Sequence, residues 1–326
     1  MNGEQAGELE RRDIRDQIDR ILQDLGSPDP PLKLEDVRSL LSLDIQYYTS
    51  SDPGLVSELI HRFRLLVGKT IPDLGRHLQV ALSKSKLCAF WIPAPARIML
   101  DSDVPKPKHR WIEAHEVIHS IVPWHKKFLL GDNAQTLDPT CHAVLEAEAN
   151  YGAGRLLFFN DRFGVEARDV DLSFKSIQLL KRRYGNSMVS TFWRIVEDRN
   201  PDEPVFGLIS VHPHYPEIGS HGGPKPWRYF IRSVAFARQF SKISPGAVFE
   251  IIKTHASHRR AGPIFAAEDV ITDDLGAERV IELESFSTTH AVLTLGYATR
   301  VRSLTAKQGT QSKQATSLSA GFGEVL

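Results

Sequence analysis

The sequence predicts a mixed α+β fold, with a mostly helical first half that carries a small sheet and a β-rich second half. Up to about residue 200, apolar residues recur every three or four positions, which is typical of amphipathic helices. Beyond Pro201 the chain changes to alternating and aromatic segments, which favour half-buried strands. With 326 residues and 41% hydrophobic content, the chain is long enough for two domains, or for one domain with a large extension.

The elements of the first half follow from this periodicity. Glu8 to Leu25 is expected to form a charged helix, ended by Gly26 and a proline-rich link through Pro31. The next predicted elements are a helix from Leu34 to Leu43, a strand from Ile45 to Tyr48, a helix from Leu55 to Val67, and strands from Leu87 to Trp91 and from Arg97 to Leu100. A further helix, from His109 or Arg110 to about Val122, is expected to begin after Pro105 and Pro107 and to stop at Pro123.

This last helix contains the pattern H-E-x-x-H, formed by His115, Glu116 and His119. Side chains four residues apart on a helix lie one above the other, so both histidines can direct an imidazole nitrogen at one metal ion. Glu116 then lies beside the open coordination position, where a carboxylate can take the proton of a water that attacks a peptide carbonyl. The pattern predicts a zinc site in which Glu116 is the catalytic base.

Zinc in such a site needs a third protein ligand, and a second helical segment, from Leu145 to Leu157, supplies a candidate. Its packed face is expected to comprise Ala149, Gly152, Ala153, Leu156 and Leu157. A rotation of about 100° per residue then places Glu146 at the edge of this face and Glu148 well off it. Glu146 is therefore the expected ligand, and Asn150, one turn later, can hydrogen-bond a ligating histidine.

Two other residues are alternative third ligands. His125 follows His119 by six residues, which is the spacing of the extended pattern H-E-x-x-H-x-x-G-x-x-H. Val122 stands where that pattern has its glycine, and a branched side chain resists the turn that the glycine allows. His125 is better suited to contact substrate or to stabilise an oxyanion. Glu148 would replace Glu146 if the second helix presented another face.

Together the two segments resemble the ImmA/IrrE family of zinc metallopeptidases, in which H-E-x-x-H is followed by E-x-E-A-N-x-F-A-x-x-L-L. Ala114 to His119 carries the first pattern and Glu146 to Leu157 the second, and the resemblance covers roughly Leu34 to Arg199. The chain departs from the family at Gly152, which replaces a usual Phe, and at Phe158-Phe159, which replaces a usual Met-Pro.

The resemblance implies that His115, His119 and Glu146 bind zinc and that Glu116 is the general base. It also implies a zincin-like catalytic domain, with a small sheet before the active-site helix, in a cytoplasmic bacterial or phage-related enzyme that cuts a protein partner such as a transcriptional repressor. The expected organisation is an N-terminal helix and linker (1–31), a zincin-like metallopeptidase domain (32–200), a β-rich domain of unknown role (203–302) and a disordered tail (303–326).

Two further features of the chain leave alternatives open. The helical stretches from Phe174 to Tyr184 and from Ser187 to Val196 could form a DNA-binding helix-turn-helix, or a helical hairpin packed under the catalytic cleft, which their apolar spacing favours. The strands expected in the second half are Val205 to Val211, Trp227 to Phe236, Ala247 to Ile252, Arg279 to Phe286 and Thr289 to Tyr297, the last two as a hairpin. His212, His214 and His221 lie in Pro/Gly loops, where solvent exposure is favoured over metal or substrate contact.

Composition limits the class of protein. Forty basic and forty acidic residues give zero net charge, which argues against a protein that coats nucleic acid. Two cysteines, no apolar leader and no apolar run of membrane length favour a reducing cytoplasm. We therefore expect a zinc-dependent hydrolase whose partner is a protein substrate, not a membrane or nucleic acid. The alternative is a regulatory DNA- or protein-binding protein on a non-catalytic zincin scaffold, which the intact Glu116 disfavours.

Overall fold

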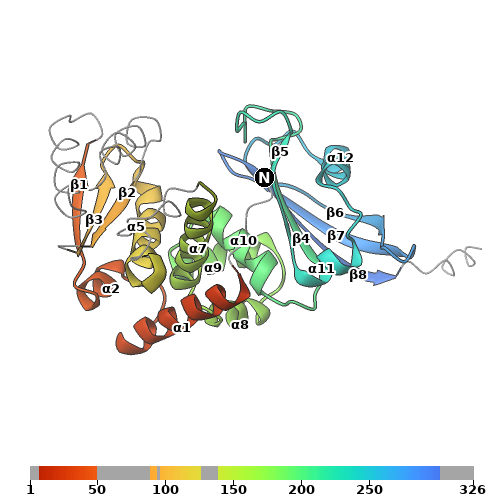
Figure 1. The fold of residues 1–326 in the computed structure, drawn as a ribbon. Helices are drawn as coiled ribbons and strands as arrows, with labels where there is room; N and C mark the ends of the chain where they lie inside the picture. Colours follow the sequence, from red (N-terminus) through yellow and green to blue (C-terminus); the bar gives the residue numbers. More distant parts are fainter. Residues whose placement is uncertain (1–6, 50–88, 94–95, 126–138, 302–326) are drawn as a thin grey trace, which may run out of the picture.

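The computed structural model describes residues 7–49, 89–93, 96–125 and 139–301. Helices dominate the first half of the chain, and a larger sheet with flanking helices forms the second half (Figure 1). The prediction of a mixed α+β fold is confirmed. The helix expected from Leu55 to Val67 and the tail expected at 303–326 lie outside the described residues. Within the described ranges, no helix combines the length and the apolar character needed to cross a membrane.

The first half contains a three-stranded sheet followed by helices. Its elements are α1 (Glu8–Asp24), α2 (Leu34–Leu40), β1 (Asp44–Tyr48), β2 (Ala89–Pro93), β3 (Ala96–Asp101), α5 (Lys106–Ile121), α7 (Pro139–Leu157), α8 (Arg162–Arg168), α9 (Phe174–Tyr184) and α10 (Met188–Asp198). The strand order is β1-β3-β2, with β3 parallel to β1 and antiparallel to β2. Helix α5 begins earlier than expected, because Pro107 lies in its first turn, where the missing N–H has no helical partner to lose.

Helix α1 contributes to the same hydrophobic core as the motif helix. Ile14 and Ile18 are fully buried, in one cluster with Val117 and Ile118 of α5 and Leu156 of α7. The spacing of four between the isoleucines explains this, since it gives the otherwise charged helix one apolar stripe. Residues 8–24 therefore pack as part of the helical half.

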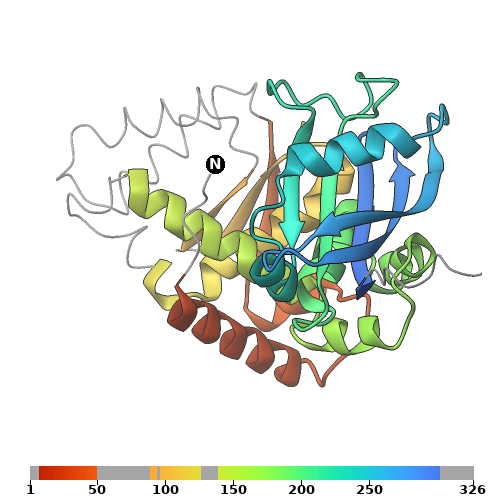
Figure 2. The same cartoon turned by 90° about the vertical axis from the view of Figure 1, so that its right-hand side faces the viewer.

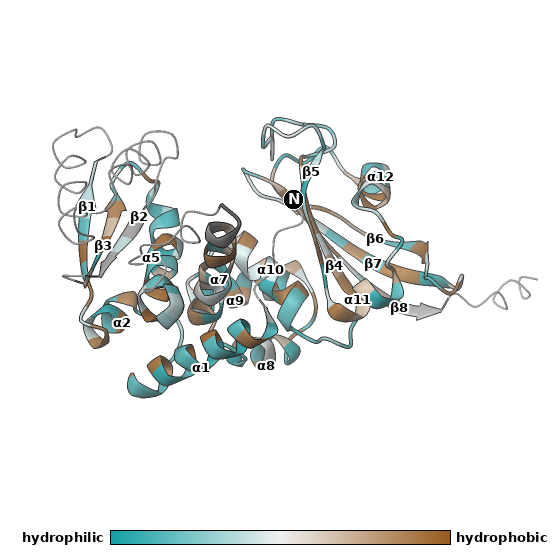
Figure 3. Cartoon of the chain, viewed as in Figure 1, coloured by the Kyte–Doolittle hydropathy of each residue, from teal (hydrophilic) through white to brown (hydrophobic). Residues whose placement is uncertain are grey.

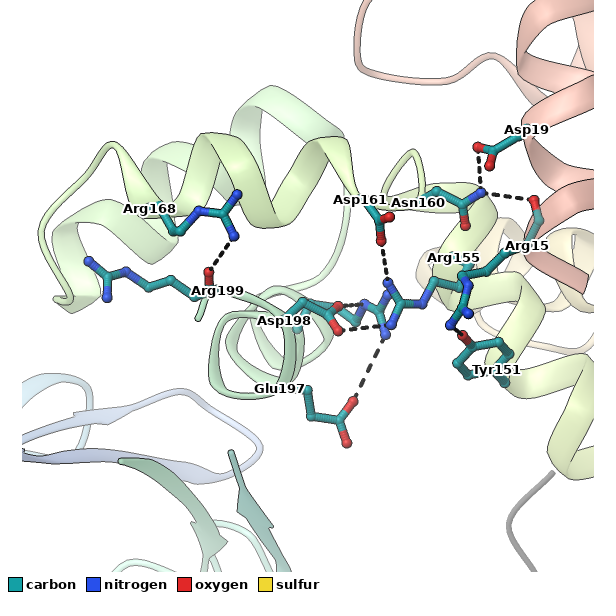
Figure 4. Close-up of polar contacts among 11 residues, drawn as sticks. Arg15, Asp19, Tyr151, Arg155, Asn160, Asp161, Arg168, Glu197, Asp198 and Arg199 are labelled. Carbon is teal, nitrogen blue, oxygen red and sulfur yellow. Dashed lines mark hydrogen bonds and ion pairs between the residues drawn. The ribbon is translucent and has the colours of Figure 1, made fainter. Parts of the chain in front are cut away.

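A polar network also ties α1 to α7 and α10 (Figure 4). The Arg15 guanidinium donates a hydrogen bond to the Tyr151 hydroxyl at 3.0 Å, and it comes from α1. Arg155, one turn further along α7, donates to Asp198 of α10 at 3.1 Å. Helix α7 is thus held from two sides by elements far apart in the sequence.

The second half is a five-stranded antiparallel sheet in the order β5-β4-β8-β7-β6. Its elements are β4 (Val205–Ser210), β5 (Trp227–Arg232), α11 (Val234–Gln239), α12 (Pro245–His255), β6 (Gly262–Thr272), β7 (Glu278–Ser287) and β8 (Val292–Val301). The pairing of β7 with β8 confirms the predicted hairpin. Strand β6 is an element that the apolar alternation does not predict, because Glu268 and Asp269 interrupt it.

The strand expected from Ala247 to Ile252 is wrong, since these residues lie in α12. Ser244 caps this helix, and its hydroxyl accepts a hydrogen bond from the backbone N–H of Ala247 at 3.1 Å. Pro245 follows in the first turn, where its fixed φ suits a helix. Capping chemistry therefore decides the structure of an apolar run that is too short to show a period.

Helices cover both faces of the larger sheet, so every residue of β4 is buried. Val205 and Ile209 pack in the cluster that contains α10, whereas Phe206 and Leu208 pack in the cluster that contains α11 and α12. Figure 2 shows α12 lying across the strands, and Figure 3 shows β4 predominantly in brown. Alternate side chains of a strand point to opposite faces, so a strand covered on both sides is apolar throughout.

Helices α9 and α10 form the predicted hairpin, and other elements pack on two sides of α10. Its buried residues are Thr191, Phe192, Arg194, Ile195 and Val196. The helix lies between α8 and α9 on one side and the larger sheet on the other (Figure 1). A recognition helix must present one face to a major groove. The packing of α10 therefore favours the helical hairpin over a DNA-binding helix-turn-helix, and the hairpin joins the two halves of the molecule.

Candidate metal centre

Three side chains from α5 and α7 converge on one point. The Nε2 atoms of His115 and His119 lie 3.1 Å apart. One carboxylate oxygen of Glu146 lies 3.2 Å from His115 Nε2, and the other lies 3.5 Å from His119 Nε2. Ligands held 2.0–2.1 Å from zinc in a tetrahedron are separated by about 3.3 Å. The three expected ligands are therefore brought together at about the spacing that tetrahedral coordination of one ion needs.

This convergence depends on the close approach of α7 to α5. A Cβ atom on Gly152 would lie only 2.8 Å from the Cγ2 atom of Ile118, the residue before His119. Gly154, two residues later, has more room, since a Cβ atom there would lie 3.5 Å from the Trp111 ring. The departure from the ImmA/IrrE pattern at Gly152 thus occurs where a larger side chain would collide with Ile118 of α5.

The other ring nitrogens of both histidines have partners behind the site. His115 Nδ1 lies 3.2 Å from Asn150 Oδ1, so Asn150 hydrogen-bonds His115, one of the two expected histidine ligands. His119 Nδ1 lies 2.9 Å from His125 Nδ1. Contacts of this kind fix the orientation of a metal-ligating imidazole. They direct both Nε2 atoms toward Glu146.

His125 does not meet the expectations for a third ligand or a substrate contact. Its side chain is fully buried, and it faces the nitrogen of His119 that points away from Glu146. The chain bends at Val122 and Pro123, where α5 ends, and this bend places His125 behind His119. A side chain in that position can orient the site but cannot reach a substrate in front of it.

The prediction from helical rotation, that Glu148 lies well off the packed face of α7, gives no indication of its burial. Glu148 is 2% exposed, and its Oε2 atom lies 2.6 Å from Trp124 Nε1 and 2.8 Å from His125 Nε2. The prediction assumed that α7 has a single packed face. The segment that follows α5 covers a second face, so Glu148 is buried although it lies well off the first. Glu148 does not replace Glu146, because it does not face the point of convergence.

Glu116 is next to His115 and is 6% exposed. Burial raises the pKa of its carboxyl to about 7, although the neighbouring His115 opposes this change. A carboxyl group with a pKa near the ambient pH can both take a proton and return it. The position and the pKa of Glu116 thus suit a general base.

The charge states of the converging side chains suit a metal ligand set. Burial lowers the pKa of His119 to about 4, so its ring is neutral near pH 7. Burial alone would raise the pKa of Glu146, but its contacts with His115 and then His119 outweigh burial and hold that pKa well below its usual range. Burial alone would lower the pKa of His115, but contacts with Glu146 and the charge of Glu116 raise it. A metal ion would therefore displace the proton that His115 shares with Glu146.

The histidines of the second half do not form a comparable group. His212 is buried rather than exposed, and its Nε2 atom lies 2.9 Å from the backbone oxygen of Arg259. His214 Nε2 lies 2.9 Å from the backbone oxygen of Ala256. Among the described residues, His115, His119 and Glu146 are the one group of three or more His, Cys, Asp or Glu side chains whose ligand atoms all lie within 4.8 Å of one another.

The sequence matches no protein-family model and no curated protein. Among solved structures, a chain described as a Mycobacterium tuberculosis transcriptional regulator superimposes with a TM-score of 0.50 and 12% sequence identity. The match covers 88% of this chain and 75% of that chain, so it extends over both halves of the molecule. At this identity the likeness concerns the fold alone.

Proposed function

We propose that this protein is a zinc-dependent metalloendopeptidase with a zincin-like catalytic domain. The observation that carries the proposal is the convergence of His115 Nε2, His119 Nε2 and the Glu146 carboxylate at 3.1–3.5 Å, beside a buried Glu116. Two neutral imidazoles and a carboxylate are a usual ligand set for catalytic zinc. The resemblance of both segments to ImmA/IrrE metallopeptidases supports the same four roles.

A zinc ion held by these residues would act as a Lewis acid, activating a water molecule and polarising the carbonyl of a scissile peptide bond. Glu116 takes a proton from the attacking water as its oxygen bonds to the carbonyl carbon. It then gives the proton to the amide nitrogen as the C–N bond breaks, so that a carboxyl and an amine are released. Asn150 and His125 keep the two ligating rings in place.

The proposed substrate is a protein in the cytoplasm, and the resemblance favours a transcriptional repressor. A second candidate is a regulatory protein that keeps the zincin scaffold without catalysis. The description of the structural neighbour as a transcriptional regulator is the observation in its favour. The two candidates differ in what they require of Glu116, because a scaffold has no use for a base beside the metal site.

The test compares the full-length protein with Glu116→Gln. Protein purified without a histidine tag is expected to hold about one zinc per chain, as an open three-ligand site implies. Glutamine has almost the volume of glutamate but cannot take the proton of water. Glu116→Gln should therefore keep its zinc and its melting temperature, while the rate of cleavage falls roughly 10²–10⁴-fold.

Cleavage is measured by mass spectrometry on a peptide library made from a bacterial proteome, and in cells that require the protein. A chelator should abolish cleavage and added zinc should restore it. Absence of zinc from the purified protein, with no uptake on titration, would contradict the metallopeptidase. Full biological activity of Glu116→Gln would instead favour the regulatory scaffold.

A further inference from the structure

We infer that Glu148 and His125 are positioning residues that determine which ring nitrogen of His119 carries its proton, and so keep His119 Nε2 free to bind metal. The inference deepens the proposed function and depends on its metal site. It stands on three contacts in a buried line: Trp124 Nε1 to Glu148 Oε2 at 2.6 Å, His125 Nε2 to the same oxygen at 2.8 Å, and His125 Nδ1 to His119 Nδ1 at 2.9 Å.

The direction of each hydrogen bond follows from the chemistry of the end group. The indole N–H of Trp124 can only donate, so Glu148 Oε2 is an acceptor. A second contact on that oxygen is satisfied when His125 Nε2 carries a proton and donates it. With His125 neutral, its ring has one N–H, so Nδ1 is then left with a lone pair.

That lone pair decides the state of His119. The two Nδ1 atoms are 2.9 Å apart, so one of them must carry a proton that the other accepts. Because His125 Nδ1 is the acceptor, the proton lies on His119 Nδ1. The Nε2 atom of a neutral His119 is then unprotonated and faces His115 and Glu146.

Burial restricts these groups to the hydrogen bonds described, so the sequence of donors and acceptors is fixed. The side chain of His125 is fully buried and that of Glu148 is 2% exposed, so solvent does not offer either group an alternative partner. An unpaired polar group in such a place costs free energy. Helix α7 therefore supplies the site with both a ligand, Glu146, and the acceptor two residues later that orients the second histidine.

The experiment uses the full chain with Glu148→Met, which removes the acceptor at similar volume. Without this acceptor, the Nε2–H and Nδ1–H tautomers of His125 become closer in free energy. In the molecules in which His125 donates from Nδ1, the proton of His119 should move to its Nε2 atom. Zinc affinity, measured by competition with a chelator, should fall roughly 10–100-fold, the usual effect of removing such a contact. The matched control is Glu148→Gln, whose amide oxygen still accepts from Trp124 and His125. It should keep most of the affinity.

A second readout does not depend on metal or on activity. In metal-free protein labelled with ¹⁵N-histidine, long-range ¹H–¹⁵N spectra show which nitrogen of each ring is protonated. Wild-type His119 should be in the Nδ1–H form and should become mixed in Glu148→Met. His125→Asn should preserve the Nδ1–H form, because its amide oxygen can accept in place of His125 Nδ1.

The outcomes separate the two proposals. An Nε2–H form of His119 in the wild type would overturn the inference, even if Glu148→Met failed to fold. Equal zinc affinity of Glu148→Met and wild type would also overturn it and would leave the metallopeptidase standing. A wild-type protein that binds no zinc would contradict the proposed function, while the protonation of His119 would still be measured.

Discussion

The molecule contains two groups of histidines that differ in how their ring nitrogens are used. The motif histidines, His115, His119 and His125, lie on or just after α5, and their partners are carboxylates, an amide and one another. The loop histidines, His212 and His214, lie beyond β4 and contact backbone oxygens of a neighbouring loop. Clustering of histidines alone does not make a metal site. The motif histidines differ because two of them direct their Nε2 atoms at one carboxylate, that of Glu146.

Contacts around the loop histidines explain why they hold a loop rather than an ion. His212 Nδ1 accepts the backbone N–H of His214 at 3.1 Å, so both of its ring nitrogens are occupied by backbone groups. The His214 ring stacks on that of His258 with centroids 3.9 Å apart, so these rings meet through their faces. The nearby Glu217 is paired with Arg260. The loop histidines therefore fasten the segment around residue 212 to residues 256–259.

Removal of one partner from each group should give the largest contrast. Glu146→Ala takes a ligand away from the motif histidines, and its zinc affinity should fall by at least about 100-fold, more than the loss of an orienting contact causes. His212→Ala should leave zinc affinity unchanged. It should lower the free energy of unfolding by about 1–3 kcal/mol, because the backbone groups of Arg259 and His214 lose their buried partner.

Both variants are measured by metal analysis and by chemical denaturation. Zinc retained in Glu146→Ala but lost in His212→Ala would reverse the comparison. Zinc retained in Glu146→Ala but lost in Glu148→Ala would mean that α7 presents a different carboxylate to the ion.

The second contrast concerns the helix spacing on which the motif histidines depend. Gly152→Ala would place a Cβ atom 2.8 Å from Ile118, and overpacking of this kind costs about 1–3 kcal/mol. Replacing a helical glycine by alanine gains up to about 1 kcal/mol, so the net result should be a loss of stability. Since α7 must shift away from α5, zinc affinity should fall as well.

Gly154→Ala is the matched control on the same helix. Its Cβ atom would lie at an ordinary 3.5 Å from Trp111, so the gain in helix propensity of about 0.5–1 kcal/mol should remain. Unfolding and zinc titration of both variants test the spacing. Equal stabilisation by the two alanines would show that Ile118 moves aside without effect.

The parts of the site that sequence predicts are those governed by one helix. The spacing of His115 and His119 fixes their shared face, and the helical period selects Glu146 from α7. Glu148 escapes the same reasoning, because its burial depends on where Trp124 and His125 lie after the chain leaves α5. No period within α7 contains that information.

The fold shows the same limit. Long helices with a marked apolar stripe, such as α1, are predicted nearly to the residue. The segment from Ala247 to Ile252 is too short for a period, and the capping serine at 244 is the better guide. Burial of His212 follows from a loop 47 residues further along the chain, so its own sequence surroundings do not indicate it.

The smallest expected effect concerns the pH dependence of the loop histidines. Burial lowers the pKa of His212 below its usual value, although its hydrogen bond to the Arg259 backbone opposes this change. As the pH falls, the unfolded chain takes up this proton before the folded protein does. The contribution of His212 to stability is therefore present above the unfolded pKa of about 6.5 and is lost as the pH falls below it.

His212→Gln tests this directly, because its amide N–H can still donate to the Arg259 oxygen while it cannot titrate. Between about pH 7.5 and pH 5.5, the free energy of unfolding should fall more steeply for the wild type than for His212→Gln, since a shift in pKa sets the slope of stability against pH. Chemical denaturation of both proteins in the same metal state gives the two slopes, and other titrating groups cancel in their difference. Equal slopes would mean that the pKa of His212 is the same in the folded and unfolded chains. Its hydrogen bonds would then hold the ring without the effect of desolvation. A steeper slope for His212→Gln would mean that folding raises the pKa of His212. The surroundings of the loop histidines would then stabilise positive charge, as the surroundings of a cation do.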